Sequence, residues 1–265
     1  MAGNTLIKIQ SLSHHFGVKP VLQSVNFEIQ QGEMIAIMGA NGIGKSTLLK
    51  AIAGILQPLE GQVSIAGKIR RNSVEEELHI RKQVAYLPDH PWTPMNRTGR
   101  EFLIGTGQIY NIPAQRLMDH VQRLLHLFNL EENGDSPIQN YSNGQKKKIA
   151  IASALVTEAP ILILDEPFTG GLDPSAIHAL KKVLKHLAER EDVTVIIASQ
   201  IPEIVEALSH RVVILENGRV RTIGTIKQLQ AETNCTGNLE LILEKLLNPE
   251  TETMVANYFN HNTGK

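Results

Sequence analysis

The 265-residue chain has one cysteine, Cys235, and lacks both a strong excess of one charge and a long apolar run. A single cysteine excludes an internal disulfide and gives no indication of an oxidising compartment, so we expect cytosolic folding. The 26 basic residues (Lys and Arg) nearly balance the 27 acidic ones, and the formal net charge of −1 provides no global positive field for nucleic acid. No apolar run approaches the roughly 18 to 20 residues that span a bilayer, and the N-terminus lacks the pattern of a signal peptide. We therefore expect a chain that cannot cross a membrane by itself.

The apolar pattern, in a chain with 42% hydrophobic residues, predicts a globular α/β fold. Apolar and polar residues alternate over 5–12 and 21–30, which predicts two antiparallel strands separated by a turn-like stretch at 13–20. Further along, short apolar runs alternate with helical patterns, which predicts a mainly parallel central sheet. The Asn217-Gly218 pair between two apolar runs predicts a β-hairpin.

Between about residues 90 and 155 the pattern becomes mainly helical, which predicts a helical subdomain inserted into the α/β fold. Two predicted helices begin with the spacing of a capping box, at residues 73–76 and 98–101. We place the main domain at residues 4–225. Residues 226–265 then form a C-terminal extension to which the sequence assigns no chemistry.

A glycine-rich segment follows one apolar run and precedes a helical pattern. Its residues are Gly39, Ala40, Asn41, Gly42, Ile43, Gly44, Lys45, Ser46 and Thr47, and they fit the phosphate-loop pattern Gly-x-x-x-x-Gly-Lys-[Ser/Thr]. The glycines let successive backbone N–H groups point at phosphate oxygens, with the positive end of the helix dipole behind them. We expect Lys45 to contact the outer phosphates and Ser46 to supply a hydroxyl ligand to Mg²⁺. The alternative is an exposed glycine-rich turn.

Two carboxylates, Asp165 and Glu166, follow a fully apolar predicted strand. Strand ends at the carboxyl edge of an open parallel sheet are where such folds bind ligands, and the phosphate loop lies on the same edge. Asp165 is suited to hold Mg²⁺, directly or through water, and Glu166 to orient or deprotonate a water that attacks a γ-phosphate. The alternative is a pair of solvated carboxylates at a strand end.

A third motif lies within the predicted helical subdomain. It reads Tyr141-Ser142-Asn143-Gly144-Gln145 and is followed by three lysines and a helical pattern, whose first turn Ser142 can cap. With this motif the chain resembles the ATP-binding cassette (ABC) ATPases over about residues 4–225. The resemblance implies a P-loop NTPase core with a mixed, mainly parallel sheet, an N-terminal antiparallel β subdomain and a helical subdomain. It also implies that Ser142, Gly144 and Gln145 contact ATP bound by a second cassette, in a head-to-tail dimer.

Other positions match the family, and two depart from it. Phe16 stands at the adenine-stacking aromatic, although a buried core role is an alternative, and residues 171–174 stand at the dimer-contact loop. Asp89 replaces a glutamine that reaches Mg²⁺ and the attacking water, and Gln200 replaces a histidine that contacts the γ-phosphate. Because an amide cannot carry positive charge, these departures predict slow ATP hydrolysis.

The resemblance implies an ATP-hydrolysing subunit of a membrane transporter that uses ATP and Mg²⁺. Residues 88–113 resemble the corresponding segment of the ABC ATPases of bacterial drug, peptide and antibiotic-resistance exporters. In this segment Trp92, with Pro91 and Pro94, can form an apolar socket for the membrane subunit; the alternative is that Trp92 belongs to the core. The expected partners are polytopic membrane subunits and a second cassette, without nucleic acid. The expected location is cytoplasmic, peripheral on the inner face of the cell membrane. The alternatives are a degenerate cassette of a heterodimer, a soluble ABC protein of translation or DNA repair, and a non-hydrolysing regulatory cassette.

Overall fold

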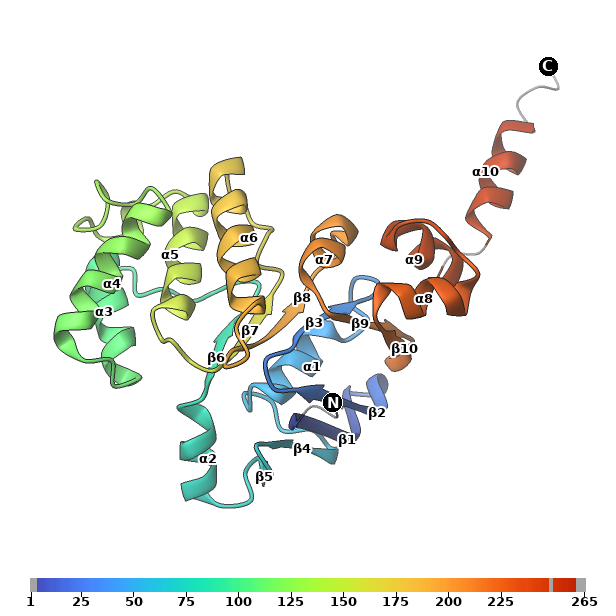
Figure 1. Cartoon of the computed structure of the whole chain (residues 1–265), viewed down its shortest axis with the longest axis horizontal. Helices are drawn as coiled ribbons and strands as arrows, with labels where there is room; N and C mark the ends of the chain where they lie inside the picture. The colour runs from blue at the N-terminus through green and yellow to red at the C-terminus, as the bar shows by residue number, and fades with distance from the viewer. Residues whose placement is uncertain (1–3, 248–249, 261–265) are drawn as a thin grey trace.

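The computed structural model describes residues 4–247 and 250–260, and contains two β-sheets with helices packed around them (Figure 1). The smaller sheet is antiparallel, with the order β2-β1-β4-β5. Its strands are β1 (Thr5–Phe16), β2 (Lys19–Gln30), β4 (Glu60–Ile65) and β5 (Lys68–Ile69). The predicted pairing of the first two strands is confirmed, but the predicted turn at 13–20 was too long. Only Gly17 and Val18 form the loop, because Gly17 takes the positive φ (+65°) that a two-residue hairpin requires.

The larger sheet has six strands in the order β10-β9-β3-β8-β7-β6, and only β10 is antiparallel to its neighbour. Its strands are β3 (Met34–Met38), β6 (Val84–Leu87), β7 (Ile161–Asp165), β8 (Thr194–Ala198), β9 (Arg211–Glu216) and β10 (Arg219–Gly224). Every residue of β3, β7 and β8 is buried, because helices or the second sheet cover both faces. The hairpin predicted at Asn217-Gly218 is confirmed, with positive φ at both residues. The predicted α/β fold class is therefore confirmed.

The helical subdomain contains three α-helices and one short 3₁₀ turn among the residues described between 90 and 155. They are α3 (Gly99–Ile109), α4 (Ala114–Leu127), the turn at Ile138–Asn140, and α5 (Asn143–Leu155). The helices beside the sheets are α1 (Lys45–Ile52), α2 (Val74–Arg81), α6 (Pro174–Ala188) and α7 (Pro202–Leu208). In the parts of the chain that the structure describes, no helix combines the length and apolar character that a membrane span requires.

Of the two predicted capping boxes, one is complete. At α3, Thr98 and Glu101 exchange both hydrogen bonds. At α2, the Ser73 hydroxyl accepts from the Glu76 N–H, but the Glu76 carboxylate accepts from the Asn72 side chain instead of turning back to Ser73. The capping box predicted at 73–76 is therefore wrong in one of its two hydrogen bonds, because the neighbouring Asn72 amide binds the Glu76 carboxylate.

The C-terminal region forms α8 (Ile226–Thr233), α9 (Leu239–Leu247) and α10 (Thr251–Asn260). Leu229, Leu239 and Ile242 pack with Ala36 and Val212 of the large sheet. Two of these helices therefore share a core with the main domain, although they lie beyond the predicted boundary at residue 225. The last helix, α10, points away from the rest of the chain (Figure 1).

Candidate nucleotide-binding site

The phosphate loop connects β3 to α1, as the sequence predicts. Gly39, Gly42 and Gly44 all have positive φ (149°, 75° and 114°). A Cβ atom on Gly39 would lie 2.6 Å from the backbone oxygen of Leu215, and one on Gly44 would lie 2.9 Å from that of Val21. The tight loop therefore needs glycine at these two positions for steric reasons as well as for φ.

Lys45, the first residue of α1, extends back across this loop. Its ammonium donates to the backbone oxygens of Gly39 (2.8 Å) and Ala40 (3.2 Å) and lies 4.0 Å from Oε1 of Glu166. Burial lowers the pKa of Lys45, while the nearby carboxylates of Glu166 and Asp165 act in the opposite direction. The loop therefore presents a buried cation between its own carbonyls and the end of β7.

Asp165 and Glu166 lie at the end of β7, where both are almost fully buried (1% and 7% exposed). The alternative of solvated carboxylates is therefore wrong. Within the described chain, Oδ1 of Asp165 and Oε2 of Glu166 have no hydrogen-bond partner. Burial raises the pKa of both carboxyls, although the Ser46 and Tyr86 hydroxyls partly offset this for Asp165. Buried oxygens without partners are suited to hold a cation or a water molecule.

Gln200 joins the phosphate loop to the acidic pair. It follows β8, the neighbour of β7, and its Nε2 donates to Oδ1 of Asn41 (2.6 Å) and to Oε1 of Glu166 (3.0 Å). Both amide hydrogens are thus engaged, and the bond to Glu166 favours the ionised carboxylate. Three segments that are distant in sequence converge here on one edge of the sheet.

Asp89 lies at the border of this site, with its side chain 39% exposed. Its Oδ1 accepts weakly from the Thr169 hydroxyl (3.5 Å) and lies 3.8 Å from the ammonium of Lys147. It makes no hydrogen bond or ion pair with Asp165 or Ser46 in the described chain, but its charge raises the pKa of Asp165. Asp89 is therefore a peripheral candidate for the metal site.

Lys147 is a central residue that sequence reasoning missed. Its buried ammonium donates to the backbone oxygens of Asp89 (2.9 Å) and Glu166 (3.1 Å) and thereby joins the segment after β6 to the end of β7. Burial lowers its pKa, and the surrounding carboxylates oppose this shift. The sequence shows Lys147 only as the middle of three consecutive lysines, with nothing that distinguishes it from its neighbours.

The motif at 141–145 begins α5, and its two polar side chains serve the helix end. Ser142 accepts from the N–H of Gln145 (3.2 Å), and the Gln145 side chain accepts from the N–H of Ser142 (2.9 Å), so the predicted cap is confirmed. A Cβ on Gly144 would lie 2.6 Å from the backbone oxygen of Gly171, which places the motif against the 171–174 loop. Among the described residues, no hydrogen bond or ion pair joins the motif to the phosphate loop.

The two aromatic residues singled out from the sequence, Phe16 and Trp92, are both exposed, so the alternative that they belong to the core is wrong for both. Phe16 is 60% exposed at the end of β1, and its ring meets the His14 ring edge to face, with centroids 4.7 Å apart. Trp92 is 80% exposed and lines a groove of about 390 Å³ with Pro94, Phe102 and others. Both are free to contact another molecule.

The chain is similar to known proteins over most of its length. The family described as "ABC transporter" matches residues 22–169. Nod factor export ATP-binding protein I of Burkholderia pseudomallei is 32% identical over 230 residues, which cover 86% of this chain and 74% of the relative. Energy-coupling factor transporter ATP-binding protein EcfA3 of Clostridium perfringens is 30% identical over 243 residues, 91% of this chain and 85% of that protein. A solved structure described as the ATP binding subunit of an ABC transporter is 32% identical, with a TM-score of 0.84 over 91% of this chain and 99% of the other.

Proposed function

This chain belongs to the ABC transporter family as an ATP-binding subunit, and from that premise we propose that it drives a membrane exporter by slow ATP hydrolysis. Members of this family are ATPases. The observation that carries the slow rate is the Gln200 amide, which links Asn41 of the phosphate loop to the Glu166 carboxylate.

In this proposal, residues 39–47 hold the phosphates of ATP through the loop N–H groups and the Lys45 ammonium. The exposed ring of Phe16 stacks on the adenine. Mg²⁺ fits the buried Oδ1 of Asp165 and the nearby Ser46 hydroxyl, because both are hard oxygen ligands, with Asp89 as a further ligand at the border. A bound Mg²⁺ would supply neutralisation of phosphate charge.

Glu166 is the general base of the proposed reaction. It accepts a proton from water, whose oxygen bonds to the γ-phosphorus while the bond between this phosphorus and ADP breaks. Its raised pKa, caused mainly by burial, brings the carboxylate closer to the working pH and makes it a better proton acceptor than an exposed glutamate. Gln200 holds this carboxylate in place, and its hydrogen bond favours the ionised form against the effect of burial.

The same Gln200 limits the rate. Its amide can donate to the γ-phosphate only by giving up a bond to Asn41 or Glu166, and it cannot carry the positive charge that a histidine could place there. Charged donors make hydrogen bonds about twice as strong as neutral ones, which corresponds here to about 1.4 kcal/mol, or tenfold in rate.

Replacement of Gln200 tests this account in steady-state phosphate release. We expect Gln200→His to raise kcat about tenfold and Gln200→Ala to lower it by at least the same factor, because alanine donates nothing. ATP affinity, measured by calorimetry, serves as the control that all variants fold. An unchanged or lower kcat in Gln200→His would contradict the proposal.

We further propose that the chain acts as one of two cassettes attached to polytopic membrane subunits, on the cytoplasmic face of the cell membrane. Among the described residues the α5 motif makes no hydrogen bond or ion pair with the phosphate loop of its own chain, which supports head-to-tail pairing with a second cassette. The Trp92 groove supports docking of a membrane subunit, and the export function in a relative's name supports the exporter class. Co-purification with a polytopic membrane protein tests this, and replacement of Trp92 by Glu should abolish it without changing ATP affinity.

A further inference from the structure

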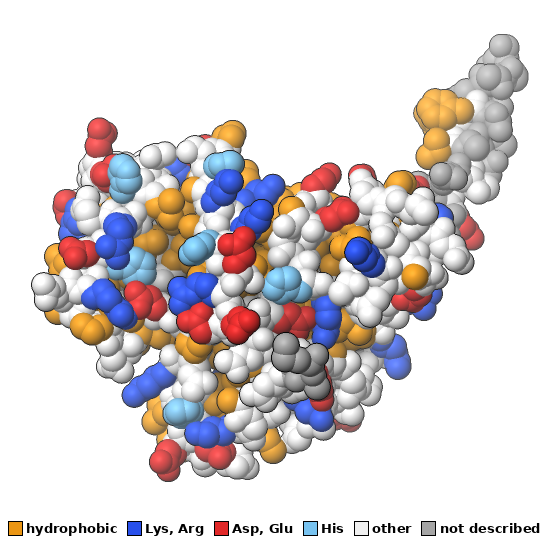
Figure 2. All heavy atoms as spheres, in the orientation of Figure 1, with side chains coloured by type: hydrophobic (Ala, Val, Ile, Leu, Met, Phe, Trp, Pro, Cys, Tyr) orange, Lys and Arg blue, Asp and Glu red, His pale blue; other side chains and the backbone are white. Residues whose placement is uncertain are grey.

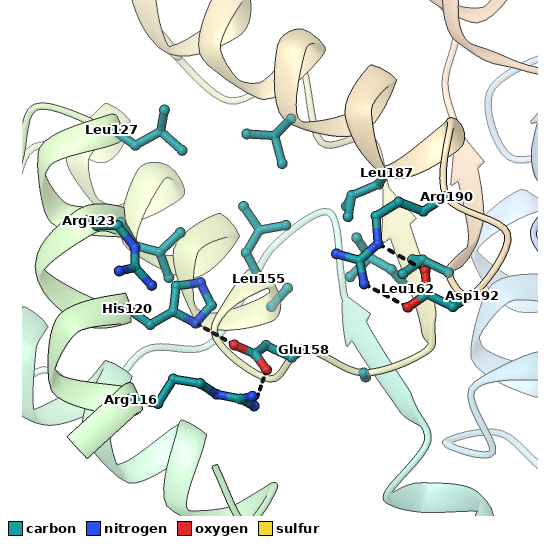
Figure 3. A pocket seen from close by; sticks show the side chains of 15 residues that line it. Arg116, His120, Arg123, Leu127, Leu155, Glu158, Leu162, Leu187, Arg190 and Asp192 are labelled. Carbon is teal, nitrogen blue, oxygen red and sulfur yellow. Dashed lines mark hydrogen bonds and ion pairs between the residues drawn. The ribbon is translucent and has the colours of Figure 1, made fainter. Parts of the chain in front are cut away.

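A pocket of about 760 Å³ lies between α4, the C-terminal end of α5 and α6, and it takes no part in the proposed ATP site (Figure 3). Its floor is apolar and includes Leu124, Leu155, Leu162 and Leu187. Small-molecule sites in proteins typically have volumes of roughly 300 to 1,000 Å³ and mostly apolar walls with a few polar groups. The size and the lining therefore suit one small ligand.

Charged side chains stand at two sides of this floor (Figure 3). On the α4 side, Arg116 forms an ion pair with Glu158. On the α6 side, Arg190 makes two hydrogen bonds to Asp192, at 2.9 and 2.7 Å. Both carboxylates of the pocket are thus already paired with a guanidinium, which disfavours a cationic ligand.

The remaining cation is Arg123, which lies one turn along α4 from His120, on the side facing the pocket (Figure 3). Its guanidinium makes no ion pair or hydrogen bond with any described residue. With Arg123, the pocket has three guanidinium groups against two carboxylates, an excess of one positive charge. On the face shown in Figure 2, acidic and basic side chains are both present across the surface.

His120 supplies a second polar group at the same place. Its Nδ1 is buried and lies 3.2 Å from Oε1 of Glu158, without making a hydrogen bond in the described chain. Burial lowers the pKa of His120, so the ring is neutral at neutral pH and retains one N–H donor. An unpaired guanidinium and an imidazole whose Nδ1 faces the Glu158 carboxylate thus lie beside an apolar floor.

We propose that this pocket binds a small amphipathic anion, a molecule with one carboxylate or sulfonate group and an apolar body. The anionic group contacts Arg123 and His120, and the body covers Leu155, Leu162 and Leu187. The ligand contacts both α4 and α6, and so joins the helical subdomain to the sheet domain.

Two fluorescent probes that share one apolar body test the proposal: anilinonaphthalene sulfonate, and phenylnaphthylamine, which lacks the sulfonate. Titrations use the full chain with saturating ADP, so that the phosphate loop is occupied and cannot bind the sulfonate. We expect the anionic probe to bind at one site, about five- to tenfold more tightly than the neutral probe, because Arg123 adds a partly exposed charged hydrogen bond. Added salt should weaken only the anionic probe.

The variant Arg123→Gln should weaken the anionic probe about five- to tenfold and leave the neutral probe unchanged. Its ADP affinity should equal that of the unmodified chain, since Arg123 lies outside the nucleotide site. Arg97→Gln is the matched control, because Arg97 is an exposed arginine at the Trp92 groove, the other apolar surface that could take the probe. Equal affinity for both probes, or loss of binding in Arg97→Gln but not in Arg123→Gln, would overturn the proposal.

Discussion

Replacement of Lys147 by Met tests a buried cation that the sequence does not distinguish from the lysines on either side of it. Lys147 is 4% exposed and donates to two backbone oxygens, those of Asp89 and Glu166. The aliphatic part of the Lys147 side chain packs beside Gly170: a Cβ atom added to Gly170 would lie 3.5 Å from Cδ of Lys147. Methionine keeps most of this packing and removes only the ammonium.

The expected loss in the free energy of unfolding follows from these contacts. Two hydrogen bonds from a charged donor are worth about 1.5 to 3 kcal/mol each, and burial of the ammonium offsets several kcal/mol of that gain. The Glu166 oxygen retains the Thr169 hydroxyl as a donor at 2.9 Å, while the Asp89 oxygen loses its side-chain partner. We therefore expect Lys147→Met to lower the free energy of unfolding by about 2 kcal/mol.

Urea denaturation followed by circular dichroism measures this loss. With a slope of about 3 kcal/mol per molar for a chain of this size, the midpoint should fall by roughly 0.7 M. Lys146→Met is the control, because the Lys146 side chain makes no hydrogen bond or ion pair with the described residues, and the midpoint of this variant should move by less than about 0.2 M. Equal shifts in the two variants would refute the role assigned to Lys147. ATP hydrolysis should also fall in Lys147→Met alone, because Asp89 and Glu166 lose their common anchor.

Two further predictions concern the nucleotide site. Glu166→Gln should lower kcat by about 10² to 10⁴ without loss of ATP affinity, and in the unmodified chain kcat should fall with decreasing pH through the raised pKa of Glu166, above the range of an exposed glutamate. Because the pKa of Glu166 is raised in the folded state, ionisation of this carboxyl lowers the stability of the fold as pH rises above about 4.5. Glu166→Gln should therefore unfold at a temperature about 2 °C higher at neutral pH, and this gain should vanish below about pH 4.5. A fall of kcat at the pKa of an exposed glutamate would contradict the predictions for both kcat and stability. Phe16→Ala should weaken ATP about tenfold by calorimetry, while inorganic triphosphate, which has no base to stack, should bind unchanged; equal losses for the two ligands would exclude stacking.

Features set by neighbouring residues could be predicted from the sequence. The cap of α5 joins residues three apart, and the hairpin at Asn217-Gly218 needs positive φ at adjacent positions that these two residues tolerate. The α2 cap shows the limit of such reasoning, since Ser73 caps the helix but Asn72 diverts Glu76. A local pattern gives the possible partners of a side chain, and competition between them is decided by geometry.

The sequence by itself determined the family, the phosphate loop and the carboxylates at the end of β7, because these depend on residue order within short segments that follow buried strands. Only the tertiary structure decided which side chains meet across the fold. It brought Gln200 to Asn41, 159 positions away, and left Phe16 exposed. It also buried Lys147 and Lys148 and gave them different partners, Lys147 at the end of β7 and Lys148 at Asp173. These outcomes depend on how β7, β8 and α5 pack together, and no periodicity within any one of them contains that information.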